Sequence, residues 1–455
     1  MDTNLWKIPC NIPIEYRESV IRILKTSLEA VDPFLAVKKA ILRRKDGFSI
    51  NGKEFYLYPD TKIKVVSFGK AAVSMIRGFV EVFEDKIQSG VVVTKNLLPE
   101  EILRCEKFQV IKSSHPVPDE KSVLAAETVI NFLKDTRDED IVFFLISGGG
   151  SALLTAPVDD LRLEQVQKLT QMLLASGATI QEMNVIRKHL DKVKGGKLAL
   201  AAYPARFISL VISDVTNNAL DTIASGPTAA DSSTFDDAIN ILQRYMLWEG
   251  ISREIQNYLE AGVKGSQPET VKKDHPVWQK GYNQIIASNA SAMYAAKEQA
   301  IIEGFSAYVN EAPFTGEAQE VGRYLVHQAR EQWKEQLQSS QRACIIFGGE
   351  TTVTLKGNGK GGRNQEVALG AAKALAGSTN ELLITLATDG EDGPTDAAGA
   401  CVNGITFQDA KRLHLDIDEA LDSNNAFPLL EKSGLLVKTG PTGTNVNDLA
   451  FWFSF

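Results

Sequence analysis

The stretch from residue 141 to residue 154, IVFFLISGGGSALL, constrains the fold more than any other part of the chain. Its first six residues are all apolar and mostly β-branched or aromatic, which is typical of a strand buried on both faces. Three glycines follow, between Ser147 and Ser151, and a helix-forming run begins directly after them. Such a loop lets backbone N–H groups approach an anion at the positive end of a helix dipole. The stretch predicts a nucleotide phosphate site; the alternative is a tight turn without a ligand.

Apolar segments of strand length alternate with amphipathic segments along the rest of the chain. We expect further strands at residues 62–68, 90–94, 108–111, 207–212, 284–287, 305–309, 343–347 and 382–387. We expect two helices within residues 14–44 and others at residues 71–83, 119–135, 163–175, 180–202, 317–336 and 365–375. This alternation predicts parallel sheets built from right-handed crossovers, in which ligands bind beyond the carboxyl ends of the strands.

The length of 455 residues predicts two domains. Residues 249–279 are more polar than their surroundings and contain several glycines, prolines and lysines, so we expect the linker there. The net charge of -8 argues against broad nucleic-acid binding, which needs a basic surface. No apolar run approaches the length of a membrane span, and the first residues do not form a secretory signal. A cytoplasmic enzyme is therefore the default expectation, with neither nucleic acid nor membrane as a partner.

Polar and charged residues follow many of the predicted strands. The loops concerned include FGK with Lys70, SGGGS at residues 147–151, SDVTNN with Asp214, SNAS with Asn289, GGE with Glu350, GNGKGGRNQE with Arg363, and TDGEDG with Asp389. Glycines, carboxylates and a few cations on such loops suit phosphoryl transfer. That chemistry needs backbone amides for phosphates, carboxylates for Mg²⁺, and cations for the charge on the transferred group.

Lys70 and Arg363 are the cations that we expect to carry the chemistry. Lysine acts as a point charge on phosphate oxygens, and arginine binds phosphate or carboxylate with two parallel hydrogen bonds. Arg363 lies in a loop with four glycines, so its backbone can approach a ligand closely. The alternative for Lys70 is a solvated residue at a helix start, although a lysine there opposes the helix dipole.

Four carboxylates are candidates for holding Mg²⁺ or for orienting a hydroxyl group: Asp214, Glu350, Asp389 and Asp448. Asp389 directly follows an apolar strand and precedes a glycine, which places it at a strand end. Asp–Gly pairs also form ordinary turns, and we interpret the neighbouring Asp392 as a solvated turn residue. The metal prediction rests on Asp214 and Asp389.

Residues 184–197, NVIRKHLDKVKGGK, form a basic segment in an acidic protein. Arg187 and Lys188 could bind an anionic substrate, and a solvated helix face is the equal alternative. His115, which precedes a proline, reads as a loop residue. Serine-hydrolase, zinc-protease and protein-kinase signatures are missing from the sequence.

Several motifs together resemble the glycerate 2-kinase family of the MOFRL type. They are FGKAA (68–72), LISGGGSALL (145–154), IRKHLDKVKGGKLA (186–199), ISDVTNNALDTIASGPT (212–228), GGETTV (348–353), GGRNQE (361–366) and ATDGEDGPTDAAGA (387–400). The resemblance covers the chain from about residue 16 onward. It implies transfer of the γ-phosphoryl group of ATP, with Mg²⁺, to the 2-hydroxyl of D-glycerate. The products would be 2-phosphoglycerate and ADP.

The resemblance also implies the fold and the roles of the site residues. The fold would be two different α/β domains with the active site in the cleft between them. Residues 1–262 would form a Rossmann-like three-layer domain with a parallel sheet, onto which the C-terminal tail could pack. Residues 275–455 would form a MOFRL-type domain with a mixed sheet. The family's catalytic lysine and arginine match Lys70 and Arg363, to which we add Asp389.

The remaining roles follow from the residue types and their places on the predicted loops. Nucleotide binding is expected from Ser147, Gly148, Gly149, Gly150, Ser151, Asp214, Asn289 and Glu350. Substrate binding is expected from Arg187, Lys188, Lys70 and Arg363. Family members have also been labelled hydroxypyruvate reductases, so an NAD(P)H-dependent reductase is the alternative, although GxGxxG is missing. A nucleotide-binding sensor without turnover is a third reading. The oligomeric state stays open, with a homodimer as one option.

Overall fold

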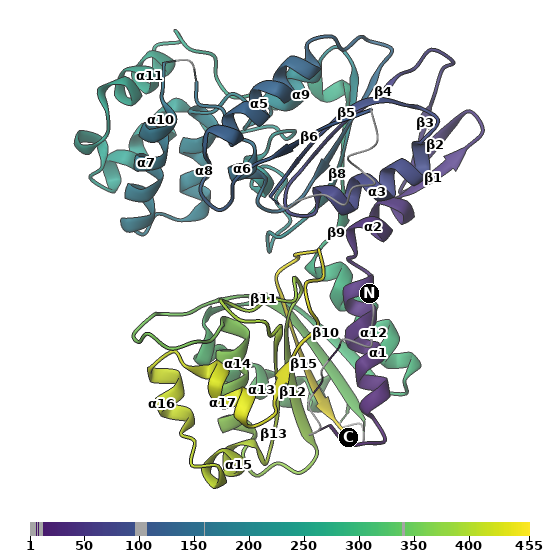
Figure 1. Ribbon diagram of the computed structural model, residues 1–455, viewed down its shortest axis with the longest axis vertical. Helices are drawn as coiled ribbons and strands as arrows, with labels where there is room; N and C mark the ends of the chain where they lie inside the picture. Colours follow the sequence, from purple (N-terminus) through teal and green to yellow (C-terminus); the bar gives the residue numbers. More distant parts are fainter. Residues whose placement is uncertain (1–5, 7, 9–11, 96–106, 159, 339–341) are drawn as a thin grey trace. The chain divides into compact units, whose positions relative to one another are not determined.

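The apolar stretch Ile141–Ile146 forms strand β7, whose six residues are all buried. It lies in one of two units into which the chain divides in this computed structural model (Figure 1). The structure describes residues 6, 8, 12–95, 107–158, 160–338 and 342–455. We call residues 33–286 the parallel-sheet unit. Residues 287–455, together with the chain up to Asp32, form the mixed-sheet unit.

The parallel-sheet unit contains a six-stranded sheet in the order β6-β5-β4-β7-β8-β9, and its pairing is parallel from β6 to β8. Its strands are β4 (Ile63–Phe68), β5 (Ile87–Thr94), β6 (Phe108–Lys112), β7, β8 (Arg206–Ile212) and β9 (Gly281–Ala287). The chain starts at the middle of the sheet, builds outward to β6 and then returns to β7. The topological switch point therefore lies between β4 and β7, and ligands bind at this position in sheets of this kind.

Helices cover both faces of this sheet. Side chains of β7 alternate between the two faces of the sheet. Val142, Phe144 and Ile146 pack in a core with α5 (Glu120–Leu133) and α9 (Lys197–Ala202), whereas Phe143 lies on the other face. On that other face lie α3 (Ala72–Phe83) and a small antiparallel sheet of β1 (Ile41–Arg44), β2 (Gly47–Ile50) and β3 (Lys53–Tyr56). They are joined to β7 through tilted and edge-on phenylalanine contacts. This confirms the predicted three-layer arrangement. The small sheet was not predicted.

A group of helices packs around its own core beside the parallel sheet (Figure 1). Its members are α7 (Leu163–Ala175), α8 (Ile180–His189), α10 (Phe235–Arg244) and α11 (Arg253–Val263). The linker prediction at residues 249–279 is therefore wrong, because α11 buries Ile255 and Leu259 in this core. The single helix predicted at residues 180–202 is also wrong. Gly195 and Gly196 adopt positive φ angles, of 59° and 82°, and separate α8 from α9.

The remaining elements of this unit are short. They are α2 (Pro33–Ala40), α6 (Gly150–Leu153) and three 3₁₀ turns at Ile223–Ser225, Trp248–Gly250 and Pro276–Lys280. Within the ranges that the structure describes, no helix is both long and apolar enough to cross a lipid bilayer.

The mixed-sheet unit has a sheet in the order β10-β11-β15-β12-β13-β14. Its strands are β10 (Ser306–Glu317), β11 (Ala343–Thr352), β12 (Glu381–Ala387), β13 (Gly399–Asn403), β14 (Leu436–Val437) and β15 (Asp448–Ser454). β10 and β11 are parallel, whereas β15 is antiparallel to both β11 and β12. The C-terminal segment is thus an inner strand of this sheet. The suggestion that the tail packs on the N-terminal domain is wrong.

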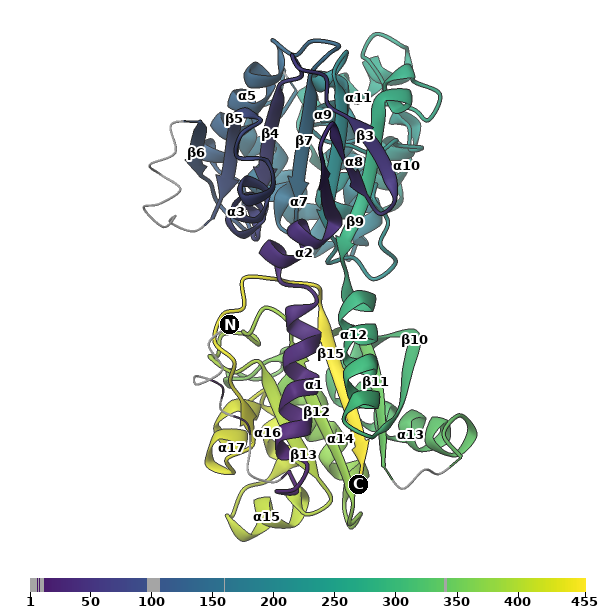
Figure 2. The ribbon, with the colours of Figure 1, turned by 90° about the vertical axis from the view of Figure 1, so that its right-hand side faces the viewer.

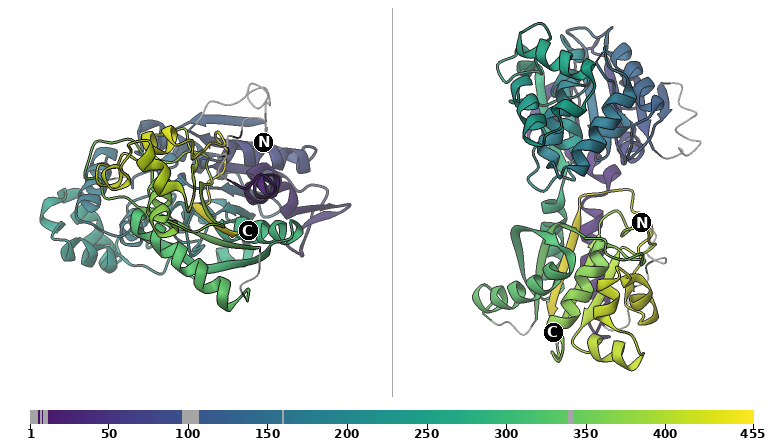
Figure 3. Two further views of the ribbon diagram at one scale, coloured as in Figure 1. Left: turned by 90° about the horizontal axis from the view of Figure 1, so that it is seen from below. Right: turned by 90° about the vertical axis from the view of Figure 1, so that its left-hand side faces the viewer.

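Helices flank both faces of the mixed sheet. Figure 2 shows α1 (Arg17–Glu29) and α12 (Asn289–Ile302) on one face, and Figure 3 shows α13 (Ala318–Glu335) and α14 (Arg363–Leu375) on the other. α15 (Thr406–Arg412), α16 (Ile417–Asp422) and α17 (Ala426–Lys432) complete the unit. The predicted α/β class, with a parallel sheet followed by a mixed sheet, is confirmed.

The observed units differ from the predicted boundaries at 1–262 and 275–455. The N-terminal helix α1 belongs with the C-terminal half of the chain, because it packs against α12. Tyr16 stacks on Phe455 with ring centroids 4.9 Å apart, and Arg22 pairs with Glu303 at 2.7 Å. The parallel-sheet unit extends to Ile286, since β9 is its sixth strand.

Candidate functional site

Two loops leave the parallel sheet side by side at the switch point. Phe68 of β4 pairs with Ile146 of β7, so the loops that follow these strands start at the same edge. Lys70 donates its backbone N–H to the carbonyl of Gly148 at 2.9 Å. The Ser147 hydroxyl accepts from the N–H of Ala71 at 3.0 Å. Ser147 thus holds the two loops together at the edge of the sheet.

The glycine tract is needed because other side chains press against it. A β-carbon on Gly148 would collide with the Asp214 carboxylate, which places this acid against the tract. Gly149 has a φ of 81°, and a β-carbon there would lie 3.0 Å from His115 Cδ2 and 3.1 Å from Lys70 Cγ. The structure therefore brings Lys70, Asp214 and the tract together. It adds His115, which the sequence analysis treated as a loop residue.

The helix that follows the tract is weaker than expected. α6 contains only four residues, Gly150–Leu153, so its dipole is small compared with that of a full helix. Ser151 Oγ lies 2.7 Å from Ser225 Oγ, and the Ser225 hydroxyl in turn donates to Asn184 Oδ1 at 3.0 Å. Any anion binding here depends on the loop amides and nearby cations more than on a helix dipole.

A cavity of about 390 Å³ opens beside the tract. Its lining combines the tract, the loop of His115, helix α7, Arg187 of α8, and the pair Asp191 and Lys194. Cavities of this size accommodate small-molecule ligands. Lys194 donates to Asp191 and to Thr155 Oγ1 (3.1 Å), so the charges of this buried pair largely compensate each other.

Arg187 and Lys188, predicted together as substrate ligands, occupy different environments. Arg187 lines the cavity, and no ion pair to it is found among the residues that the structure describes. Burial lowers the pKa of its guanidinium from the ordinary value. Lys188 instead pairs with Asp231 at 3.1 Å and Asp221 at 3.5 Å and is buried. Successive helix residues point in directions about 100° apart, so only Arg187 reaches the cavity. Lys188 does not line this cavity, so its predicted role in substrate binding has no support from the cavity's geometry.

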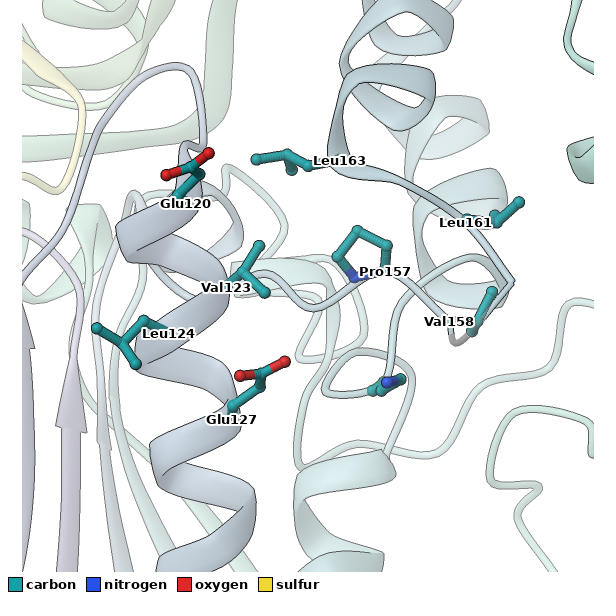
Figure 4. A pocket seen from close by; sticks show the side chains of 9 residues that line it. Glu120, Val123, Leu124, Glu127, Pro157, Val158, Leu161 and Leu163 are labelled. Atoms are coloured by element: carbon teal, nitrogen blue, oxygen red, sulfur yellow. The ribbon is translucent and has the colours of Figure 1, made fainter.

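A second hollow lies on the same unit, between α5 and the segment before α7 (Figure 4). Glu120, Val123 and Glu127 line one side, and Pro157 and Leu163 lie opposite. It is open and contains none of the predicted site residues. The cavity beside the glycine tract is therefore the candidate site of this unit.

In the mixed-sheet unit, Arg363 begins helix α14 and lies between two carboxylates. Its Nη2 donates to Asp448 Oδ1 at 3.1 Å, and its Nε lies 2.6 Å from Asp448 Oδ2 without making a hydrogen bond. Its Nη1 pairs with the half-exposed Glu350. Burial opposes the charge of Arg363, yet the two carboxylates together raise its pKa above the ordinary value. Burial raises the pKa of Asp448 to about 7, against the pull of Arg363.

The glycine-rich loop before Arg363 packs against protein. β-Carbons on Gly357 and Gly359 would collide with the backbone of Ser423, and one on Gly361 would crowd Ala426. Asn424 Oδ1 accepts from the N–H of Gly357 at 3.0 Å and fixes the loop further. We expected these glycines to allow a ligand to approach the backbone. In the structure they instead allow residues 423–426 to pack against it.

Asp392 is buried, which contradicts its interpretation as a solvated turn residue. Its carboxylate accepts from the backbone N–H groups of Asn364 at 3.0 Å and Gln365 at 2.9 Å. Asp392 therefore caps helix α14 by binding the two backbone N–H groups that follow Arg363. Gly362 makes room for its carboxylate, because a β-carbon there would collide with it. An acid three residues beyond Asp389 in the TDGED loop was the available signal.

The other predicted residues of this unit lie near the same sheet edge. Asp389 follows β12, and its side chain accepts from the N–H of Glu391 at 3.3 Å and from Asn445 at 3.4 Å. Asn289 donates to the carbonyls of Val446 at 2.9 Å and Asp448 at 3.0 Å, so its amide nitrogen fixes the entry into β15.

Two family models match successive parts of the chain. Residues 19–260 match the family described as domain of unknown function DUF4147, and residues 343–448 match the MOFRL family. A glycerate 2-kinase of Pyrococcus horikoshii is 40% identical over 96% of this chain and 97% of that protein. A D-glycerate 2-kinase of Thermotoga maritima is also 40% identical, over 96% of this chain and 98% of that protein.

The solved structure of a Thermotoga maritima glycerate kinase superimposes with a TM-score of 0.84 and 38% identity, covering 97% of this chain and all of that one. An Agrobacterium vitis protein that carries a provisional hydroxypyruvate reductase name is 36% identical over 96% of this chain and 94% of its own. Identity of this extent over nearly the whole length, together with the matching fold, leads to one conclusion: the chain belongs to the glycerate kinase family with a MOFRL domain.

Proposed function

We propose that this protein is a glycerate 2-kinase, which transfers the γ-phosphoryl group of ATP to the 2-hydroxyl of D-glycerate and gives 2-phosphoglycerate and ADP. The observation that carries the proposal is 40% identity to glycerate 2-kinases over 96% of the chain. The position of Lys70 and the glycine tract at the switch point of a parallel sheet supports it, because phosphate ligands bind there in this class of fold. A cytoplasmic location, as the composition predicts, is part of the proposal.

In this proposal the ATP phosphates bind the backbone of residues 147–151, and Lys70 and Arg363 are the catalytic cations. Cations on the equatorial oxygens stabilise the charge that spreads over the transferred group. Arg187 provides the positive charge for the substrate carboxylate. Its uncompensated guanidinium at the cavity wall supports this role.

Mg²⁺ would be held by Asp214 in the parallel-sheet unit, with Asp389 as the candidate in the mixed-sheet unit. A carboxylate packed against a phosphate loop would repel the nucleotide unless a cation lay between them, and Asp214 has this position. Among the described residues, no three His, Cys, Asp or Glu side chains form a preformed metal cluster. Mg²⁺ does not need one, because it binds through one or two carboxylates and the substrate phosphates. Asn289 and Glu350 remain proposed nucleotide contacts.

The product identifies the reaction. ³¹P NMR of the mixture formed from D-glycerate, ATP and Mg²⁺ should show 2-phosphoglycerate and ADP. Resonances of 3-phosphoglycerate would contradict the choice of hydroxyl. Oxidation of NADH with hydroxypyruvate, without ADP release from glycerate and ATP, would instead favour the reductase reading that the Agrobacterium name suggests.

A further inference from the structure

His115 has the position of a ligand-binding residue. It follows β6 on the loop that forms one wall of the cavity, and its ring lies against Gly149 on the side where the Lys70 stem also packs. The ring therefore borders both the proposed phosphate loop and a proposed catalytic cation. No role has been assigned to it so far.

The charge state of His115 suits a hydrogen-bond acceptor. Burial, followed by the positive charges of Lys70 and Lys95, lowers its pKa to about 4. The imidazole is therefore neutral near pH 7, and one of its two ring nitrogens can accept a hydrogen bond. The other cavity residues with strong charges are the compensated pair Asp191–Lys194 and the cation Arg187. The cavity lining thus brings the neutral acceptor His115 together with the uncompensated cation Arg187.

This combination is complementary to a small 2-hydroxy acid. We propose that His115 accepts the hydrogen bond of the acceptor hydroxyl in the same cavity in which Arg187 binds the carboxylate. The inference rests on the proposed function and deepens it, since it names the group that orients the nucleophile. It also predicts that the hydroxy acid is recognised by the parallel-sheet unit.

The hydroxyl oxygen forms a bond to the γ-phosphorus, and the bond from that phosphorus to the oxygen bridging to the β-phosphate breaks, with its electron pair leaving on ADP. The hydroxyl proton passes along the hydrogen bond to the His115 ring and from there to water. A weak base is sufficient, because phosphoryl transfer proceeds through a loose transition state with little proton transfer.

Steady-state kinetics of variants test this assignment. His115→Phe keeps an aromatic ring but has no acceptor nitrogen, and we expect kcat/KM for D-glycerate to fall roughly 10- to 100-fold while KM for ATP stays within about twofold. His115→Asn, which retains an acceptor, should recover part of the loss. Arg187→Met should raise KM for D-glycerate about 10- to 100-fold. The matched control is His327→Phe, an exposed histidine of α13, which should have no effect.

Propionate separates the two contacts, because it has a carboxylate and no hydroxyl. Its inhibition constant against D-glycerate should rise in Arg187→Met and stay unchanged in His115→Phe. No competition by propionate in the wild type would overturn the carboxylate contact. Unchanged kcat/KM in a folded His115→Phe protein, or an equal loss for ATP, would overturn the role of His115. A wild type that releases no ADP with D-glycerate would instead overturn the proposed function itself.

Discussion

Two glycine-rich loops look alike in the sequence but differ in what their glycines accommodate. In the parallel-sheet unit, residues 147–151 border a cavity, and Gly149 lies between His115 and Lys70. In the mixed-sheet unit, Gly357, Gly359 and Gly361 lie against residues 423–426. The first loop has glycines at the edge of a space that a ligand can fill. The second has them because another part of the chain already fills that space.

The cations beside these loops differ in the same sense. Arg187 faces the cavity without an ion pair in the described part of the chain, whereas Arg363 contacts Asp448 and Glu350. An anion can therefore bind Arg187 directly. At Arg363 it must compete with Glu350, whose side chain is half exposed, since Asp448 is buried behind the guanidinium.

The largest effect should come from removing a proposed catalytic cation from either unit. We expect Lys70→Ala and Arg363→Ala each to lower kcat by roughly 10²–10⁴, the range found for preorganised electrostatic groups. Initial rates of ADP release measure this, with unfolding midpoints to verify that each variant is folded. Near-wild-type turnover in a folded Arg363→Ala protein would contradict this role. It would mean that Asp448 and Glu350 compensate the charge of Arg363 in the wild type, so that it does not act on the transferred group.

One glycine substitution in each loop tests the difference between the two loops. Gly149→Val should raise KM for ATP strongly or abolish binding, because the side chain collides with the ligand-facing surface around His115 and Lys70. Gly359→Ala should instead cost about 1–3 kcal/mol of stability by overpacking against Ser423 and Asn425, with ATP affinity retained. Calorimetry with ATP and urea unfolding measure the two effects. Equal ATP affinities in both variants would refute the distinction.

The predictable parts of the fold are those in which the sequence of a single strand indicates its own burial. β7 is a continuous apolar run and β8 is nearly one, because both of their faces are buried, and their carboxyl ends carry the residues that the structure brings together. The place of β15 between β11 and β12 was not predictable, since it depends on pairing with strands about 60 to 100 residues away. The association of α1 with α12 has the same cause.

The site was predictable as a set of residue types and only partly as geometry. Lys70 and the glycine tract follow neighbouring strands, so their proximity follows from topology. Arg187 and Lys188 are adjacent in the sequence, and only the helix packing shows which of them is buried with Asp231. Asp392 and His115 were missed because turn acids and loop histidines are usually solvated, and their burial depends on residues distant in the chain.

The burial of Asp448 predicts a pH-dependent stability, because it raises the pKa of this carboxyl more than the pairing with Arg363 lowers it. Folding keeps Asp448 protonated up to about pH 7, whereas the unfolded chain releases this proton near pH 4. This contribution to stability is therefore complete below about pH 4 and is lost as the pH rises to about 7. Asp448→Asn should remove the effect, so that its unfolding free energy changes less between pH 5 and pH 8 than that of the wild type, by a few kcal/mol at about 1.4 kcal/mol per pKa unit. Unfolding free energies are measured by urea titration at each pH. If they change with pH equally in both proteins, the raised pKa of Asp448 is contradicted.

The smallest effect should distinguish the two units at their helix caps. Asp392→Ala removes the cap of α14, and Thr234→Ala removes that of α10 in the parallel-sheet unit, where the Thr234 hydroxyl accepts from the N–H of Asp237 at 3.2 Å. Each change should cost about 1 kcal/mol of stability. Only the first should also lower kcat, by about threefold to tenfold, because α14 begins at Arg363 and a small displacement of its first turn moves the guanidinium. Equal turnover in the two variants, measured at matched stability, would show that Asp448 and Glu350 are sufficient to orient Arg363.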